Sequence, residues 1–142
     1  MDEMRVAEIM RADVLVVSPE DTLGEVAEHM RDRDVGSALV TEYGRLVGIL
    51  TSRDLLRALA GRVHSSEARV RQWMSGEPIA VPATASLPEA AALMTEHGFH
   101  HLPVLDGDRP VGMVGLRDVV RASSTFGAGI GLGFELSRGA RA

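Results

Sequence analysis

The chain contains one sequence pattern twice, with the second copy 64 positions after the first and no gap between matched residues. Each copy ends on an apolar strand, a glycine and an Arg-Asp pair, as Val47–Asp54 and Val111–Asp118. Identical residues stand at matched positions along both copies: Val6/Val70, Met10/Met74, Val17/Val81, Leu23/Leu87, Glu25/Glu89, Met30/Met94, Val40/Val104, Arg45/Arg109 and Arg57/Arg121. This register predicts two copies of one supersecondary unit, packed about a pseudo-two-fold axis. Clefts between such copies are the natural place for a ligand.

The length limits how independent the copies can be. The sequence has 142 residues, enough for one compact domain or for two small ones. A half of about 60 residues buries too little surface to be stable alone, so we expect the copies to share a core. We predict a first repeat at 1–62, a second at 63–123 and a glycine-rich C-terminal tail at 124–142.

Composition excludes several classes of protein. There is no cysteine, which excludes disulfides and thiolate metal sites and fits a reducing cytosol. The net charge of -5 argues against nonspecific nucleic-acid binding. Met1–Arg11 is charged throughout and does not resemble a secretory signal, and no stretch approaches the roughly 18 apolar residues of a membrane span. We therefore expect a cytoplasmic protein with neither a nucleic-acid nor a membrane partner.

Hydrophobic periodicity predicts the same order of elements in each copy. For the first and second copy these are a helical lead-in (Val6–Met10, Val70–Met74), a buried strand (Val14–Val17, Ile79–Val81), a helix (from Thr22, from Ser86), two hairpin strands (Ser37–Thr41 with Leu46–Leu50, Leu102–Leu105 with Pro110–Val114) and a last helix (from about Thr51 to Ala60, from about Gly115 to Ser123). The fold class is thus α/β, an α+β sandwich of two pseudo-symmetric β-α-β-β-α repeats.

The ends of these elements carry specific signals. Thr22 with Glu25, and Ser86 with Glu89, have the spacing of capping boxes, in which hydroxyl and carboxylate satisfy each other's backbone N–H groups. Gly98 is a suitable stop for the second of these helices. Gly44 suits the turn of the first hairpin.

The segment Thr51-Ser52-Arg53-Asp54 is the strongest candidate for a binding site. Here a strand ends and a helix begins, and helix N-termini favour anions such as phosphate. A carboxylate three residues after a hydroxyl can accept two hydrogen bonds from the vicinal diol of a ribose. Arg53 can meet a phosphate with its forked donors.

The same segment has a purely structural interpretation. Thr-x-x-Asp at a helix start is a variant of the capping box, which folding alone requires. The second copy argues against this, because Gly115 lacks the hydroxyl while Arg117-Asp118 is kept. A capping Asp does not need an Arg before it.

The region Val6–Arg121 resembles a tandem pair of cystathionine-beta-synthase (CBS) domains, a Bateman module, of the stand-alone CBS-pair type. The resemblance rests on Val6-Ala7-Glu8-Ile9-Met10 and Val70-Arg71-Gln72-Trp73-Met74, on Ser18-Pro19-x-x-Thr22-Leu23, on His101-Leu102-Pro103-Val104, and on the two Gly-apolar-apolar-x-x-x-Asp ends. It implies a ligand-sensing module without catalytic residues. Such pairs bind adenosine compounds (AMP, ADP, ATP, sometimes S-adenosylmethionine or NAD) in two clefts between the repeats.

Carried over residue by residue, the resemblance implies two sites. In the first, Thr51, Arg53 and Asp54 face a wall from the second copy, formed by Ile79, Phe99, His100 and His101. In the second, Arg117 and Asp118 face a wall from the first copy, formed by Leu15, Val35, Gly36 and Ser37. Because Gly115 removes the hydroxyl, we expect this second site to be weaker or empty.

Two further patterns have less specific interpretations. His97, His100 and His101 could bind a transition metal, but His100 and His101 are adjacent at a strand start and should face opposite sides, so we expect no metal site. A phosphate-facing or stacking role for one of them is the alternative. The glycines at 127, 129, 131 and 133 lack the strand and acidic residue of a dinucleotide loop, which favours a flexible tail or a segment ordered by a partner.

These observations lead to one main functional hypothesis and two alternatives. We expect a regulatory module with no cofactor and no enzymatic activity, which binds an adenine nucleotide, forms a homodimer and signals to an unidentified protein target. The first alternative is a dimerisation or interaction scaffold without a ligand, against which the intact Thr51-x-x-Asp54 argues. The second is an enzyme or metal sensor that uses the histidines.

Overall fold

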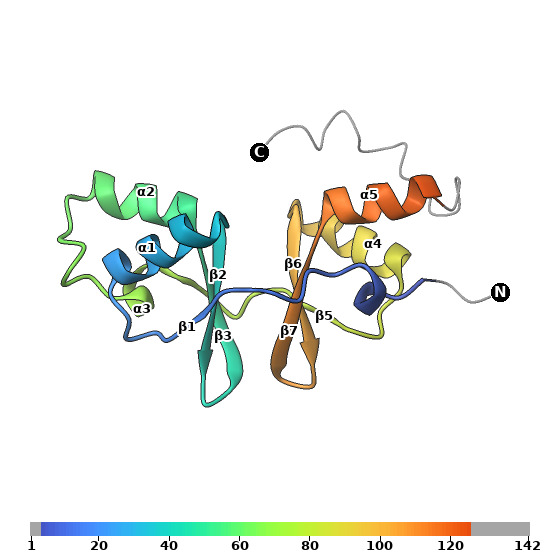
Figure 1. Cartoon of the computed structure of the whole chain (residues 1–142), viewed down its shortest axis with the longest axis horizontal. Coiled ribbons are helices and arrows are strands. Elements are labelled where there is room, and N and C mark those ends of the chain that lie inside the picture. Colours follow the sequence, from blue (N-terminus) through green and yellow to red (C-terminus); the bar gives the residue numbers. More distant parts are fainter. Residues whose placement is uncertain (1–3, 126–142) are drawn as a thin grey trace. The chain divides into compact units, whose positions relative to one another are not determined.

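The computed structural model describes residues 4–125 and is a mixed α/β protein with two sheets (Figure 1). Its elements are η1 (Val6–Glu8), β1 (Val16–Val17), α1 (Leu23–Arg33), β2 (Ser37–Glu42), β3 (Arg45–Thr51), α2 (Ser52–Ala60), α3 (Val70–Trp73), β4 (Ser75–Gly76), β5 (Val81–Pro82), α4 (Leu87–His97), β6 (His101–Asp106), β7 (Arg109–Gly115) and α5 (Leu116–Thr125). The glycines predicted to form a flexible tail lie outside the described residues. None of the helices at 4–125 has the length and apolarity that crossing a membrane requires.

The chain divides into two compact units. One consists of residues 13–78 with 108–110 and is called here the 13–78 unit. The other combines the described parts of 1–12, 79–107 and 111–142 and is called the 79–125 unit. Unit and sequence repeat are therefore different divisions of the chain, because residues 1–12 belong to the first repeat but to the 79–125 unit.

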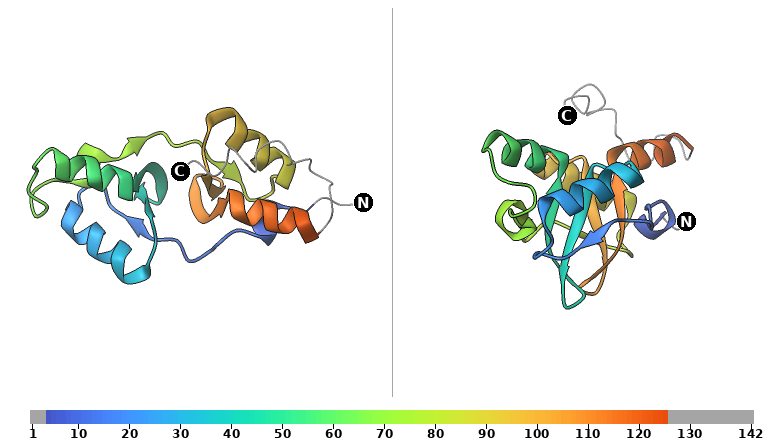
Figure 2. Two further views of the ribbon diagram at one scale, coloured as in Figure 1. Left: turned by 90° about the horizontal axis from the view of Figure 1, so that it is seen from above. Right: turned by 60° about the vertical axis from the view of Figure 1, so that its left-hand side comes forward.

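The 13–78 unit is built on a sheet in the order β1-β2-β3-β4. β1 runs parallel to β2, and the β2–β3 and β3–β4 pairs are antiparallel. Helices α1 and α2 cover one face of the β2–β3 hairpin (Figure 1) and lie side by side (Figure 2). Between helices and sheet lies a core of small and branched side chains, Leu15, Val17, Leu23, Val26, Met30, Ala38, Val40, Leu50, Ala58, Ala68 and Val70.

The first hairpin closes through a two-residue turn. Tyr43 and Gly44 both have positive φ, 56° and 79°, as a type I′ turn requires. Glu42 pairs with Arg45 across it, so the ladder is longer than the hydrophobic pattern alone predicts. The capping boxes at Thr22 and Ser86 are confirmed, and Gly98 ends α4 in the left-handed conformation with φ 70°.

The 79–125 unit repeats this architecture with a sheet in the order β5-β6-β7. β5 runs parallel to β6, with Val81 paired to Val104. Helices α4 and α5 pack together over a core of Val6, Val81, Ala85, Leu87, Ala90, Ala91, Met94, Leu102, Val104, Val114, Val119 and Ala122. An antiparallel bridge between Arg11 and Met113 stands where the 13–78 unit has β4.

The two lead-in segments are exchanged between the sequence repeats. Val6 donates its backbone N–H to Ala85 at 2.8 Å and is fully buried in the core of the 79–125 unit. Its counterpart Val70 donates to Asp21 at 2.9 Å and is fully buried in the core of the 13–78 unit. Each lead-in therefore completes the unit that contains the other repeat's strands and helices.

The glycine shared by both copies permits this exchange. A Cβ on Gly48 would lie 2.5 Å from Met74 Sδ and 3.0 Å from the Ser75 carbonyl oxygen. A Cβ on Gly112 would lie 2.5 Å from Met10 Sδ and 2.9 Å from the Arg11 carbonyl oxygen. The repeated Val-Gly pair thus marks where the exchanged lead-in crosses the strand too closely for a side chain.

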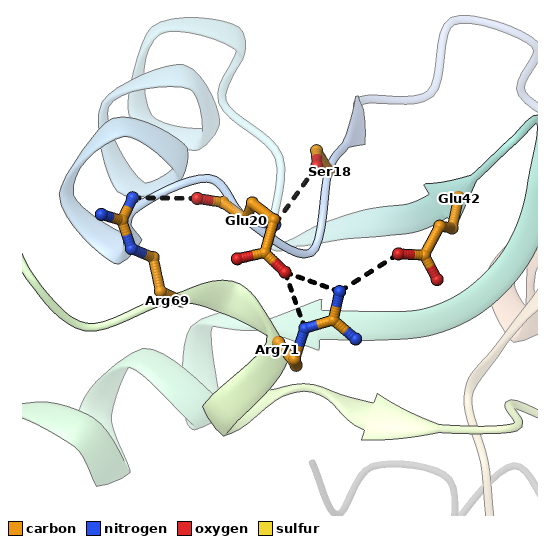
Figure 3. Close-up of polar contacts among 5 residues, drawn as sticks. All are labelled: Ser18, Glu20, Glu42, Arg69 and Arg71. Carbon is orange, nitrogen blue, oxygen red and sulfur yellow. Dashed lines mark hydrogen bonds and ion pairs between the residues drawn. The ribbon is translucent and has the colours of Figure 1, made fainter.

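Arg71 joins α3 to two other parts of the 13–78 unit (Figure 3). Its guanidinium donates to Glu20 Oε2 from Nε at 2.7 Å and to Glu42 Oε2 from Nη2 at 3.1 Å. The hydrogen bonds that Arg71 donates to these two carboxylates, with Glu20 the stronger influence, raise the pKa of Arg71. The contacts are solvent-exposed, so they orient the lead-in more than they stabilise it.

Candidate functional site

Thr51 ends β3 and is the N-cap of α2, so strand pairing and helix capping fix its side chain together. Its Oγ1 accepts a hydrogen bond from Asp54 N at 3.2 Å. Asp54 Oδ2 accepts in return from Thr51 N at 2.9 Å and from Thr51 Oγ1 at 3.0 Å. The capping interpretation of this segment is therefore present in the structure, as a complete box.

Capping does not account for the burial of Asp54. Its relative exposure is 6%, whereas Glu25 and Glu89, which perform the same capping role, are exposed. A buried carboxylate costs free energy unless it is paired. The required partner is Arg57, whose Nη1 lies 3.0 Å from Asp54 Oδ1.

Arg57 also contacts the single tryptophan of the chain. Its guanidinium carbon lies 5.7 Å from the centroid of the Trp73 ring, a cation–π geometry. Asp54, Arg57 and Trp73 therefore form a chain of contacts from the start of α2 to α3. The i, i+3 spacing of Asp54 and Arg57 on one helix was the available signal for their contact.

Four residues of the predicted second site lie in the same unit as Thr51. Ser37 pairs with Thr51 in the β2–β3 ladder, and the Gly36 carbonyl accepts from Ser52 N at 3.0 Å. Leu15 is buried and its carbonyl accepts from Leu39 N at 2.8 Å, while Val35 packs at the edge of the core. The structure thus brings Gly36 and Ser37 beside the start of α2, while Leu15 and Val35 contribute to the core of the same unit.

The equivalent helix start in the 79–125 unit has a different chemistry. Asp118 Oδ2 accepts from Gly115 N at 2.8 Å, so the carboxylate half of the capping box remains. The space beside Gly115 is occupied by His101 from β6, whose Cδ2 lies 3.0 Å from the position of a Cβ. Asp118 Oδ2 lies 3.4 Å from the same Cβ position, so both side chains border the space beside Gly115.

The environment of His101 disfavours its charged form. Although the residue as a whole is among the exposed ones, partial burial of the imidazole removes water from it, and this desolvation is the largest cause that lowers its pKa. Repulsion from His100, Arg11 and Arg117 acts in the same direction. Attraction to Asp118 opposes these effects without cancelling them.

The remaining predicted residues also belong to the 79–125 unit. The His100 carbonyl accepts from Leu116 N at 2.8 Å, which joins the start of β6 to the start of α5. Phe99 is 43% exposed and stacks on His97 with ring centroids 5.6 Å apart. Ile79 packs against the core, and Arg117 is exposed on the first turn of α5.

The predicted site residues therefore divide between the two units. Thr51, Arg53 and Asp54 share the 13–78 unit with Leu15 and Val35–Ser37, and Arg117 and Asp118 share the 79–125 unit with Ile79 and Phe99–His101. The sequence predicted sites that combine residues from different copies, and that pairing stays a prediction. It missed the close contact of His101 with Gly115, because the two are distant in sequence and meet only across β6 and β7. Within residues 4–125, no group of three or more His, Cys, Asp or Glu side chains could hold a metal ion.

Comparison with known proteins identifies the family. The protein-family model of the CBS domain matches residues 6–61 and 70–125, which are the two copies of the repeat. The chain belongs to the CBS-domain family. It contains two CBS domains in tandem, and CBS pairs are regulatory ligand-binding modules.

Curated relatives support this membership over most of the chain. The CBS domain-containing protein YhcV of Bacillus subtilis is 34% identical over 128 residues, which cover 89% of this chain and 91% of YhcV. Hypoxic response protein 1 of Mycobacterium tuberculosis is 33% identical over 116 residues, covering 80% of this chain and 81% of that protein.

Solved structures show the same CBS-pair fold. A putative signal-transduction protein with CBS domains from Burkholderia ambifaria has a TM-score of 0.76 and 29% identity, covering 86% of this chain and 95% of that one. Hypoxic Response Protein I, crystallised with two coordinated zinc ions, has a TM-score of 0.74 and 32% identity, covering 83% and 98%. The CBS pair of protein MJ0100, in complex with 5-methylthioadenosine and S-adenosyl-L-methionine, has a TM-score of 0.78 over 89% and 100%, and at 22% identity it is similar in fold alone.

Proposed function

We propose that this CBS pair is a regulatory sensor of an adenosine nucleotide of the AMP, ADP or ATP class, with its principal site at Thr51 and Asp54. The observation that carries the proposal is the buried Asp54 carboxylate, held at the start of α2 with a charged partner. An exposed carboxylate is sufficient for capping, as Glu25 and Glu89 demonstrate. A carboxylate sequestered beside a hydroxyl is suited instead to the two hydroxyls of a ribose.

The family and the local chemistry support the proposed class of ligand. A protein of the same fold, MJ0100, holds two adenosine derivatives. In the present chain Arg53 is exposed on the first turn of α2, where it is available to a phosphate. The wall opposite Thr51 is assigned to Ile79, Phe99, His100 and His101 by the family resemblance, and we retain it as part of the proposal.

Ligand binding would signal by shifting the populations of the protein's alternative arrangements. A ligand that binds one arrangement of the protein more tightly than another stabilises that arrangement by the difference in binding free energy.

The proposed assembly is a homodimer, and the exposed leucines of α2 favour this, since Leu56 and Leu59 are 66% and 71% exposed. Replacing both with lysine should yield a monomer in sedimentation analysis, whereas Tyr43→Lys, at a site 97% exposed on a hairpin turn, should not.

The direct test is a thermal-unfolding screen with AMP, ADP, ATP, S-adenosylmethionine and NAD at neutral pH. A ligand at 100 times its dissociation constant stabilises the folded state by about 2.7 kcal/mol, a shift on the order of 5–10 °C for a chain of this size. Asp54→Ala should abolish the shift, while Asp118→Ala should change it little.

A matched pair of variants separates binding from capping. Thr51→Ala and Thr22→Ala each remove one N-cap hydroxyl from a complete capping box. Both should lower the unfolding temperature, but only Thr51→Ala should weaken the ligand shift. A wild-type protein that responds to none of the five compounds would instead favour a dimerisation scaffold without a ligand.

A further inference from the structure

One side chain joins the proposed nucleotide site to the lead-in of the same unit. Arg57 donates from Nη1 to Asp54 Oδ1 at 3.0 Å, and its guanidinium carbon lies 5.7 Å from the centroid of the Trp73 ring. A guanidinium is planar and rigid, so it cannot leave the carboxylate and keep its position over the ring. The state of Asp54 and the surroundings of Trp73 are therefore linked through Arg57.

Trp73 lies between the lead-in and the end of α2. It is the last residue of α3, is partly buried and packs against the core of the 13–78 unit. Its Cη2 lies 3.5 Å from the position that a Cβ on Gly61 would take, and Gly61 is the C-cap of α2. The indole thus contacts the helix whose first turn holds Asp54.

α3 and β4 together form the 70–76 segment, which carries this ring. Its first residue, Val70, is fully buried, whereas both residues of β4 are exposed and pair only with β3. After Gly76 the chain passes through Glu77 and Pro78 into the 79–125 unit. The part of the segment that follows Trp73 is therefore its less firmly held part, and it leads to a junction between the units.

The second copy of the repeat differs at the aromatic position. Arg57 and Arg121 are identical at matched positions, but the residue matched to Trp73 is Ile9. Isoleucine has no π system, so it offers a guanidinium no cation–π contact. The second lead-in therefore cannot make the contact that Trp73 makes with Arg57.

We propose that Arg57 and Trp73 form a relay, by which a nucleotide bound at Asp54 weakens the attachment of the 70–76 segment. This inference rests on the proposed function and adds the way in which that site signals. Asp54 Oδ2 already accepts from the N–H and the hydroxyl of Thr51, so a ribose has to bind at Oδ1. The guanidinium is then displaced from the carboxylate and from the ring together. Coupling of this kind is reciprocal, so freeing the guanidinium from Trp73 also increases the affinity for the nucleotide.

Hydrogen–deuterium exchange of the full chain tests the direction of the relay. Whichever of AMP, ADP and ATP raises the unfolding temperature should speed amide exchange in the 70–76 segment about two- to fivefold, the factor that corresponds to loss of one exposed cation–π contact. In Arg57→Ala the segment should exchange faster without nucleotide and show no further response. Arg31→Ala, which removes an exposed arginine from α1, should respond like the wild type.

Affinity provides a readout that a purely structural role of Trp73 would not change in the same direction. Trp73→Ile reproduces the residue of the second copy and should increase affinity for that nucleotide by up to about fivefold in titration calorimetry. Combined with Arg57→Ala it should add nothing further, because both changes act on one guanidinium. Trp73→Phe keeps an aromatic ring and should stay close to the wild type.

Three results would overturn the inference. Unchanged or slower exchange of the 70–76 segment in a wild-type chain that binds a nucleotide would exclude the relay and leave the proposed function intact. Weaker binding by Trp73→Ile, or full additivity with Arg57→Ala, would show that the site and the lead-in do not share the guanidinium. If AMP, ADP and ATP all leave the unfolding temperature of the wild type unchanged, the proposed function fails and this inference fails with it.

Discussion

At the scale of single residues, the Asp54 carboxylate has little hydrogen-bonding capacity left. A carboxylate offers about four acceptor positions, and Asp54 already accepts from Thr51 N, Thr51 Oγ1 and Arg57 Nη1. A ribose diol donates two hydrogen bonds, so one present partner has to leave. The Thr51 N–H is fixed by the backbone, whereas the Arg57 side chain is 61% exposed and can reorient into water. Arg57 is therefore an internal competitor for the ligand.

Removing this competitor should increase affinity. Arg57→Ala should bind the nucleotide about two- to fivefold more tightly than the wild type, since an ion pair with an exposed partner contributes only about 0.2–1 kcal/mol. Arg31→Ala, which removes the same charge from an exposed pair with Asp32 on α1, should leave affinity unchanged. Titration calorimetry measures both. Weaker binding by Arg57→Ala would mean that the guanidinium contacts the ligand instead of competing with it.

The residue scale is also where sequence reasoning was least complete. Thr51 and Asp54 could be selected because their spacing along one helix start is visible in the sequence. The contact of His101 with Gly115 could not, since it depends on which residues of β6 and β7 lie opposite each other. In the sequence, Gly115 in place of a threonine indicates only that the hydroxyl is lost. The structure shows that the His101 ring lies in the space beside Gly115.

At the scale of helices and strands, local signals were sufficient for most of the fold. The capping boxes at Thr22 and Ser86 and the end of α4 at Gly98 are set by neighbours within a few residues, and all are confirmed. The exchange of the lead-ins, by contrast, could not be predicted from such local signals. Val6 and Val70 are identical and equally apolar, so nothing in their local sequence shows which core each one enters.

The crossing glycines provide a test at this scale. Gly48→Ala and Gly112→Ala should each destabilise the fold by about 1–3 kcal/mol, because the methyl group meets a methionine sulfur and a backbone carbonyl. Gly76→Ala is the matched control, as no atom lies within 4 Å of the position of its Cβ. Denaturant unfolding followed by circular dichroism measures the three variants. Equal stability of Gly48→Ala and Gly76→Ala would contradict the close approach of the lead-in.

At the scale of the whole molecule, the division into units predicts which fragments of the chain can fold. A fragment of residues 13–78 keeps Val70 and its hydrogen bond to Asp21, whereas a fragment of residues 1–62 loses both and carries Val6 without its partners. The 13–78 fragment should therefore show more cooperative thermal unfolding than the 1–62 fragment, although both contain β1–β3, α1 and α2. A stable, cooperative 1–62 fragment would show that the repeat does not need the exchanged segment.

The exchange of lead-ins also sets an order of events during synthesis on the ribosome. Residues 13–78 emerge as one stretch, so their core can form as soon as Val70 has left the exit tunnel. Val6 is made earlier than any of them, yet its partner Ala85 and the other buried residues of its core are made after residue 78. The core of the 79–125 unit can therefore form only after the chain between Val6 and Ala85 has been made, and closing that long loop carries an entropic cost. A chain truncated after residue 78 would keep the core of the 13–78 unit and lack the residues against which Val6 packs.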